Sequence, residues 1–376
     1  MAVILSINSL AIVYLVLVIL VWTRRVFWMS GFRKTNPPLR PITQSSAALH
    51  DKVSVIVPAR NEEKNIARCL FHLMKQNYPN LEIITVDDRS EDRTGHLVEN
   101  FKMLSGFPFK TVRIDKLPPG WTGKNHAMFV GSKAATGDWL LFTDADTTHQ
   151  KESVRTALTA AIEQKIDLLT LAPETECRSF WEKTVQPLAV SSLALWFDKA
   201  VVANGQFILI RRKVYETIGG NESVQTEVVE DVALAKKVKA AGYTLKFLNG
   251  TRLYSTRMYS SLLEIKTGWT RIFTYLFNKN ALAVLHKIYL FLAFSLGPFI
   301  LLACAGYFDR TVSVLSAAAC VWIIVIRFFG NKMLKCDPWS AFLHPLSSLV
   351  MLWIMMSCLG RILFNRPSVW RGDVHR

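Results

Sequence analysis

The sequence predicts an α/β domain with a mainly parallel, mixed sheet, joined to one N-terminal and about three C-terminal transmembrane helices. Two observations lead to this prediction. Short β-branched runs alternate with segments of helical periodicity between residues 52 and 260, and uncharged apolar stretches lie near both ends of the chain. Strands that alternate with helices form sheets covered on both faces, and an apolar stretch of about 20 residues can cross a bilayer as a helix.

The composition supports a soluble domain joined to a membrane. The 376 residues are 51% hydrophobic, yet 45 Lys and Arg against 29 Asp and Glu give a net charge of +16. Such a cation excess can bind nucleic acid, but many of these cations flank apolar stretches, where they meet anionic head groups. No nucleic-acid-binding module is recognisable. We therefore expect a membrane partner and no nucleic acid.

The first 25 residues predict a retained membrane anchor. No charged residue occurs from residue 2 to residue 22, and Arg24 and Arg25 follow directly. A cleaved signal peptide has the reverse order, with its positive charge before the apolar run. The cations place the C-terminal side of the anchor in the cytoplasm. Residues 26–51, rich in proline, serine and threonine, are expected to form a linker.

The C-terminal third predicts a membrane region. An amphipathic interfacial segment is expected at 261–286, then spans at 288–308, 312–329 (the shortest) and 342–363 within a membrane region at 287–364, and a basic tail at 365–376. If all three cross, the basic tail lies outside the cell, against the charge rule. One segment can instead be re-entrant or interfacial, and Pro345 makes the last a candidate for interruption. We expect a multi-pass protein of the cell membrane with a cytoplasmic catalytic domain at 52–260.

Polar clusters follow several predicted strands. The strands are expected at 53–57, 81–86, 110–114 and 139–143. Ligands of such sheets bind beyond the carboxyl ends of the strands. The clusters at these ends are Asn61 and Glu62, Asp87 and Asp88, and Asp144 and Asp146. Their convergence on one rim predicts a ligand site there.

Asp144 and Asp146 are the predicted metal ligands. Residues i and i+2 at the tip of a strand point to the same side, and carboxylate oxygens suit Mg²⁺ or Mn²⁺ held together with a diphosphate. The alternative is that the pair caps a following helix. The six cysteines lack paired ligand spacing, which argues against zinc and favours buried thiols in a reducing compartment.

Four further groups carry two interpretations each. Asp87 and Asp88 can accept hydrogen bonds from a nucleobase or ribose, or can form a turn. Lys124, after Gly123, can bind phosphate, or can be a solvated lysine. No complete triphosphate-binding loop of the Gly-x-x-x-x-Gly-Lys-Ser type is present, which disfavours kinase chemistry.

Glu230 and Asp231 open a predicted helix, where the dipole favours acids in any protein. One of them can equally be a general base whose pKa is raised by its neighbour, and the spacing does not decide which. Trp269 and Arg271 suit a membrane interface, although Arg271 can also reach a leaving diphosphate.

These residues resemble the inverting family 2 glycosyltransferases with a GT-A catalytic domain. The resemblance covers residues 53–271 and rests on the motifs Val55-Ile-Val-Pro-Ala-Arg-Asn-Glu62, Val86-Asp-Asp-Arg-Ser90, Asp144-Ala-Asp146 and Glu230-Asp231. Finer motifs are similar to membrane enzymes associated with hopanoid and carotenoid glycosylation: Leu117-Pro-Pro-Gly-Trp-Thr-Gly-Lys124, Asn204-Gly-Gln-Phe207, Gly268-Trp-Thr-Arg271 and Trp370-Arg-Gly372.

The resemblance implies roles for individual residues. Asp146 would hold the metal, Asp144 would contact ribose or diphosphate, and Asp231 would be the general base. The nucleotide would be held by Asp87 or Asp88 and by the segment that contains Pro58, Ala59, Asn61 and Glu62.

The expected reaction is transfer of one sugar, with inversion, from a nucleotide-diphosphate sugar, such as a UDP-sugar, to a lipid hydroxyl. Polymer-forming synthases of the family carry Gln-x-x-Arg-Trp, whereas Trp269-Thr-Arg271 stands here, which favours a single transfer. The alternatives are a polysaccharide synthase and a non-catalytic membrane scaffold with a degenerate nucleotide fold.

Overall fold

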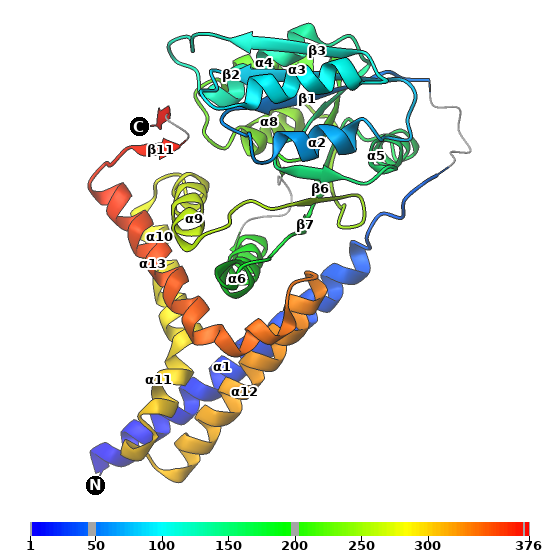
Figure 1. Ribbon diagram of the computed structural model, residues 1–376. Helices are drawn as coiled ribbons and strands as arrows, with labels where there is room; N and C mark the ends of the chain where they lie inside the picture. The colour runs from blue at the N-terminus through cyan, green and yellow to red at the C-terminus, as the bar shows by residue number, and fades with distance from the viewer. Residues whose placement is uncertain (1, 44–49, 197–202, 371–372, 376) are drawn as a thin grey trace. The chain divides into compact units, whose positions relative to one another are not determined.

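The computed structural model describes residues 2–43, 50–196, 203–370 and 373–375. The chain divides into two compact units (Figure 1). We call residues 37–176, 197–258 and 368–376 the sheet unit, and residues 1–36, 177–196 and 259–367 the helical unit. Part of the expected linker (44–49) and of the terminal Trp-Arg-Gly motif (371–372) lies outside the described residues.

The sheet unit contains a seven-stranded sheet in the order β3-β2-β1-β4-β8-β6-β9. Its strands are β1 (Val53–Ala59), β2 (Leu81–Asp88), β3 (Phe109–Ile114), β4 (Trp139–Phe142), β6 (Leu168–Ala172), β8 (Ile208–Arg211) and β9 (Leu245–Asn249). β1 to β4 are mutually parallel, β6 is parallel to β9, and β8 is antiparallel to both of its neighbours. The predicted mainly parallel sheet is confirmed, including its first four strands.

Helices cover both faces of this sheet, as β1 illustrates. Val53, Val55 and Val57 are buried on one face, and Ile56 is buried on the other, beside α4 and α8. Alternate side chains of a strand point to opposite faces, so a strand buried on both sides is apolar throughout. The helices are α2 (Ile66–Leu73), α3 (Thr94–Leu104), α4 (Gly123–Ala134), α5 (Ser153–Glu163), α7 (Arg212–Thr217) and α8 (Glu230–Ala240).

The antiparallel strand β8 shapes the rim of the sheet. Phe142, the last residue of β4, is in register with Ile208, the first residue of β8. The segment that enters β8, residues 204–207, therefore lies beside the turn that leaves β4, residues 143–146. A smaller sheet borders this turn, with the order β5 (Thr147–His149), β10 (Tyr254–Thr256) and β7 (Glu174–Thr175).

The buried carboxylate Glu82 ties the sheet together at its other end. Its Oε1 accepts hydrogen bonds of 2.6 Å from Ser54 Oγ and from the Thr136 N–H, and its Oε2 lies 3.3 Å from Lys52 Nζ and 3.5 Å from Lys110 Nζ. Burial by itself would raise the pKa of Glu82, but these partners outweigh it and lower the pKa to about 2. Glu82 is therefore an ionised structural group at neutral pH.

The helical unit contains the apolar helices expected from the sequence. Its helices are α1 (Ala2–Thr35), α6 (Phe180–Trp196), α9 (Leu262–Leu276), α10 (Ala281–Phe291), the π-helical turn η3 (Leu292–Leu296), α11 (Gly297–Ala303), α12 (Arg310–Met333) and α13 (His344–Leu363). Four helical stretches are long and apolar enough to cross a membrane: Ile7–Gly31, Ala281–Ala303, Arg310–Met333 and Pro338–Leu363. One is N-terminal and three are C-terminal, as predicted.

Several predicted boundaries were wrong. The first helix continues past Arg25 to Thr35, because no proline occurs before Pro37. The stretch expected to be the shortest span, 312–329, belongs to the 24-residue helix α12, which starts at the cap Asp309 and extends past residue 329. The segment 177–196, placed within the catalytic domain 52–260, belongs to the helical unit.

The last apolar helix also differs from expectation. Pro345 lies in the first turn of α13, where its missing N–H is not needed, so it starts the helix rather than interrupting it. α13 packs against α9, α10 and α6. The Ser347 hydroxyl donates to the Thr184 carbonyl of α6 at 2.8 Å. The most C-terminal apolar helix is thus packed on α9, which occupies residues 262–276 of the expected interfacial segment 261–286. The last residues of that segment, from Ala281, belong instead to the apolar stretch Ala281–Ala303.

Candidate active site

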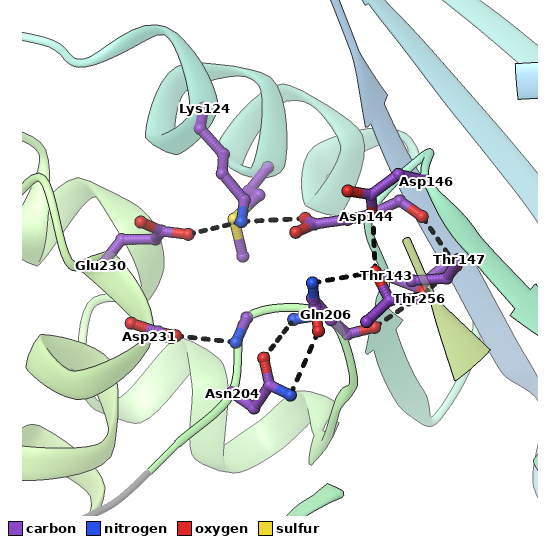
Figure 2. A network of polar contacts seen from close by, with 12 residues as sticks. Lys124, Thr143, Asp144, Asp146, Thr147, Asn204, Gln206, Glu230, Asp231 and Thr256 are labelled. Atoms are coloured by element: carbon purple, nitrogen blue, oxygen red, sulfur yellow. Dashed lines mark hydrogen bonds and ion pairs between the residues drawn. The ribbon is translucent and has the colours of Figure 1, made fainter. Parts of the chain in front are cut away.

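Lys124 joins two acidic groups that are far apart in the sequence. Its Nζ lies 2.8 Å from Asp144 Oδ1 and 2.9 Å from Glu230 Oε1 (Figure 2). Burial disfavours the charge of Lys124, but the two carboxylates outweigh that effect and raise its pKa. The lysine is therefore a permanent cation within an acidic cluster, and the interpretation of a merely solvated lysine was wrong.

The start of α4 is anchored to the segment that leads into α8. Asn125 Nδ2 donates to the carbonyls of Val224 at 2.9 Å and Glu227 at 2.8 Å. Asn221 Nδ2 in turn donates to Asn125 Oδ1 at 2.8 Å. This buried asparagine pair fixes the distance between Lys124 and the acids of α8. Sequence reasoning missed both asparagines, because nothing in their local pattern separates them from ordinary turn residues.

Asp231 is held by two backbone donors. Its Oδ2 accepts from the Gly205 N–H at 2.7 Å (Figure 2). Its Oδ1 accepts from the Val232 N–H at 2.8 Å. Burial and the adjacent Glu230 raise the pKa of Asp231 to about 7, although Lys124 and the two N–H groups oppose the shift. A carboxylate with such a pKa can accept a proton near neutral pH.

The acidic pair Asp144 and Asp146 lies in the turn between β4 and β5. Because a strand follows it, the alternative that the pair caps a helix was wrong. The Thr147 hydroxyl donates to the Asp144 carbonyl at 2.7 Å and secures the turn. The Asp144 side chain keeps 25% of its surface exposed. It can therefore contact Lys124 and a bound ligand together.

A network of buried polar side chains holds this turn in place. His149 is fully buried, and its Nε2 lies 2.9 Å from Thr143 Oγ1 and 3.1 Å from Thr147 Oγ1. Burial lowers the pKa of His149 to about 3, so the ring is neutral. Thr143 Oγ1 also donates to the Gln206 carbonyl at 2.8 Å, and Gln206 Nε2 donates to Thr256 Oγ1 at 3.1 Å. The network links the Asp144 turn to the segment that carries Gly205.

The acidic pair suits a magnesium or manganese ion bound together with a ligand. Among residues 2–43, 50–196, 203–370 and 373–375, no group of three or more His, Cys, Asp and Glu side chains is placed to hold one metal ion. Two carboxylates with oxygen donors nevertheless match a hard cation that takes its remaining ligands from diphosphate and water. Asp144 and Asp146 are the residues that would hold it.

The other predicted nucleotide-binding residues lie at the ends of β1 and β2. Ala59 is in register with Asp87, beyond the last pair of β1 with β4. Asn61, at φ 53°, accepts from the Glu91 N–H at 2.9 Å. Asp87 accepts from the Ser90 N–H at 3.1 Å. Asp87 and Asp88 are the last two residues of β2, and the hydrogen bond from Ser90 to Asp87 spans the bend that follows the strand.

Three further predicted residues complete this rim. Asp88 forms a two-pronged ion pair with Arg89, at 2.8 and 3.1 Å. Glu62 is buried and accepts from Asn65 Nδ2 at 2.8 Å. Pro58 is in register with Val86 of β2 and lies beyond the last residue of β1 that pairs with β4. Its missing N–H therefore removes no hydrogen bond between β1 and β4.

Trp269 and Arg271 belong to the helical unit, whereas the acidic cluster belongs to the sheet unit. Trp269 is 2% exposed, and its indole N–H donates to Gln186 Oε1 at 2.6 Å. Its ring stacks on Phe273 with a centroid distance of 5.3 Å. The indole therefore forms part of the core between α6 and α9.

Residues 54–219 match the family model for glycosyl transferase family 2. The chain carries a family 2 glycosyltransferase domain. The predicted enzyme class and GT-A fold are thereby confirmed.

Two relatives and one solved structure are similar to this glycosyltransferase. A 4,4'-diaponeurosporenoate glycosyltransferase of Staphylococcus aureus is 25% identical over 309 residues, which are 77% of this chain and 80% of that protein. The probable glycosyltransferase YdaM of Bacillus subtilis is 30% identical over 246 residues, 61% of this chain and 57% of YdaM. A mannosyltransferase from Pyrobaculum calidifontis, solved with GDP-Man and Mn²⁺, shares the fold with a TM-score of 0.56 and 18% identity over 95% of this chain and 99% of its own.

Proposed function

We propose that this glycosyltransferase transfers a single sugar, with inversion, from a nucleotide-diphosphate sugar to the hydroxyl of a lipid. The observation that carries the proposal is the cluster of Lys124, Asp144, Glu230 and Asp231. It combines a permanent cation, an exposed acidic turn and a carboxylate with a pKa near neutrality. These are the groups needed to receive a diphosphate and to deprotonate a hydroxyl.

Asp231 is the general base in this proposal. It takes the proton from the acceptor hydroxyl, whose oxygen attacks the anomeric carbon while the bond from that carbon to the diphosphate oxygen breaks. The Gly205 and Val232 N–H groups hold both oxygens of the carboxylate and so fix its direction. Attack from the face opposite the leaving group inverts the anomeric configuration.

Lys124 and Asp144 receive the donor. The Nζ of Lys124 is held by Asp144 and Glu230 and offers its positive charge to the departing diphosphate. Asp144 and Asp146 would hold Mg²⁺ or Mn²⁺, which neutralises charge on that diphosphate when bound. The segment from Pro58 to Glu62 and the pair Asp87 and Asp88 hold the nucleoside.

A lipid acceptor is supported by the four apolar helices and by the name of the Staphylococcus relative, a 4,4'-diaponeurosporenoate glycosyltransferase. We place the enzyme in the cell membrane with the sheet unit in the cytoplasm, where nucleotide sugars such as UDP-sugars are available. Trp269 and Arg271 belong to the amphipathic helix α9, which we assign to bringing the lipid to the site.

The test of the base is Asp231→Asn in the purified full-length enzyme with a panel of nucleotide sugars. We expect sugar transfer to fall by about 10²–10⁴-fold, while nucleotide binding changes little because Asp231 does not hold the donor. Glu227→Gln is the matched control, since Glu227 is an exposed acid three residues before Glu230. Sugar transfer at the normal rate by the Asp231→Asn variant would exclude Asp231 as the general base.

The acceptor is tested by mass spectrometry of lipids from cells with and without the protein. A lipid that gains the mass of one sugar supports the proposal. Long glycan products would identify a polysaccharide synthase instead. A protein that neither binds nucleotide in a metal-dependent manner nor hydrolyses donor would contradict the catalytic proposal altogether.

A further inference from the structure

Among the residues that the structure describes, the helical unit contains a buried arginine for which no ion pair with an acid is found. Arg327 of α12 is 5% exposed, and its Nε and Nη2 have no hydrogen-bond partner among the residues that the structure describes. Two acids of this unit are engaged elsewhere. Glu182 accepts from the Arg178 N–H at 3.0 Å, and Asp337 accepts from the Trp339 N–H at 3.0 Å. An unpaired buried guanidinium is costly and in a membrane helix commonly marks a functional site.

A second arginine lies beside it on the facing helix. α1 and α12 pack side by side (Figure 1). Trp322 Nε1 donates to Thr23 Oγ1 at 3.0 Å, and Met29 lies against Gly330. Arg25 lies between Thr23 and Met29 on α1, and Arg327 lies between Trp322 and Gly330 on α12, so these two contacts place both arginines along the same stretch of the helix pair. The Arg25 guanidinium lies 4.2 Å from the centre of the Trp22 ring, and no ion pair of Arg25 is found in the described part of the chain.

The start of α13 completes the same region. His344 is fully buried, and its ring meets Trp22 edge-on with a centroid distance of 5.6 Å. Its Nε2 lies 2.9 Å from Ser295 Oγ, whereas its Nδ1 has no partner among the described residues. His344 opens a helix of 20 residues, whose N-terminal dipole adds to the positive potential. Arg25, Arg327 and His344, from three different helices, thus have no anionic partner within the described part of the chain.

The surroundings point to an amphiphile. Arg25 follows the uncharged part of α1, and Arg327 lies near the end of α12. Phe27 and Phe329, which flank the two arginines, are 73% and 61% exposed. Head groups meet protein at such ends of apolar helices, and cations there attract anionic lipids.

We propose that Arg25, Arg327 and His344 form a binding site for the phosphate of an anionic phospholipid head group. The phosphate oxygens accept hydrogen bonds from Nε and Nη2 of Arg327, a fork geometry that arginine offers to phosphate. The acyl chains lie along the exposed apolar surface of α1 and α12. This site is built entirely within the helical unit and is distinct from the acidic cluster of the sheet unit.

The test uses the full-length protein in detergent with three additives: dioleoylphosphatidylglycerol, dioleoylphosphatidylcholine and inorganic phosphate. Lipid retention is measured by native mass spectrometry and stabilisation by thermal unfolding. We expect saturable retention and a raised Tm with the anionic lipid only. Arg327→Gln weakens that binding by about tenfold or more, because it removes the charge-assisted hydrogen bonds. Arg24→Gln, an exposed neighbour of Arg25 with the same charge, binds as the wild type does.

Arg25→Gln is the second variant, and it keeps the test open if Arg327→Gln does not fold. Arg25 is half-buried and should tolerate glutamine more readily than the buried Arg327 does. We expect the Arg25→Gln protein also to retain the anionic lipid more weakly than the wild type. Unchanged retention by a folded Arg327→Gln or Arg25→Gln protein would overturn the proposal. Equal stabilisation by inorganic phosphate would identify a soluble anion as the occupant, and equal retention of the zwitterionic lipid would exclude recognition of net charge. Both results would also overturn it.

Discussion

The backbone N–H of Gly205 donates to Oδ2 of Asp231 at 2.7 Å, and this bond joins the segment entering β8 to the first turn of α8. A Cβ atom at residue 205 would lie 3.0 Å from Lys124 Nζ and 3.3 Å from both Asp231 Oδ2 and Glu230 Oε1. A side chain at this position would therefore press on the ends of Lys124, Asp231 and Glu230. The candidate base and the cation are packed around one glycine.

Gly205→Ala tests this packing. We expect the methyl group to displace Lys124 or Asp231 and to lower kcat by about tenfold or more, because small displacements of reacting groups lower the rate strongly. Steady-state kinetics with the identified donor measures the change. Gly106→Ala is the control, since no atom lies within 4 Å of the added Cβ there. Full activity of Gly205→Ala would show that the cluster tolerates movement.

The pH dependence of transfer tests the environment of Asp231. The active form of a base is unprotonated, so kcat/KM should rise as pH increases and level off above the pKa of about 7. Glu230→Gln removes the negative neighbour that helps to raise this pKa. The rising limb should therefore move to lower pH in that variant. A limb that stays in place would mean that another group controls the profile.

Removal of divalent cations tests the acidic turn. We expect a chelator to abolish transfer and either Mg²⁺ or Mn²⁺ to restore it. Asp146→Asn should raise the half-saturating metal concentration by about tenfold or more, because one charged ligand of a hard cation is lost. Asp115→Asn is the control, as that side chain is 90% exposed and away from the turn. Full activity in the chelator would contradict a metal-assisted reaction.

Glu82 provides a prediction about stability. Glu82→Ala leaves Ser54 and the Thr136 N–H without an acceptor and should destabilise the protein by about 3 kcal/mol. In a unit of this size that lowers Tm by roughly 6–12 °C in a thermal unfolding scan. Glu99→Ala should have little effect, since Glu99 is 56% exposed.

The pH dependence of this contribution follows from the lowered pKa of Glu82. Its folded pKa is about 2, below the ordinary value of 4.5. The carboxylate therefore stabilises the fold fully above pH 4.5, and this stabilisation is lost as pH falls towards 2. The difference in Tm between wild type and Glu82→Ala should narrow over that range, and a constant difference would contradict this account.

Much of the fold could be predicted from local sequence. The run Val53–Val57 and the acids after β2 and β4 predicted a parallel sheet and its ligand rim, because strand polarity decides where carboxyl ends meet. The apolar runs predicted the number of helices that are long and apolar enough to cross a membrane, since hydrophobic length is a local property. The ends of α1 and α12 could not be predicted in the same way. The residues after Arg25 and after Phe329 are compatible with more helix, so the local sequence does not fix where either helix ends.

The site was predicted as a set of candidates and not as an arrangement. Lys124 and Asp144 were named separately, and only the fold places them 2.8 Å apart. Asn125, Gly205 and Gln206 were not assigned roles in the site, because their roles depend on partners some 26 to 102 residues away.

The sequence by itself determined the class of fold, the acidic rim and the apolar helices, because each rests on residue types and periodicities within one segment. Tertiary structure alone decided which groups meet. The antiparallel strand β8 brings Gly205 to Asp231, and the start of α4 brings Lys124 between Asp144 and Glu230. The physical reason is that burial and neighbouring charge, which raise the pKa of Asp231 to about 7, exist only when distant segments pack together.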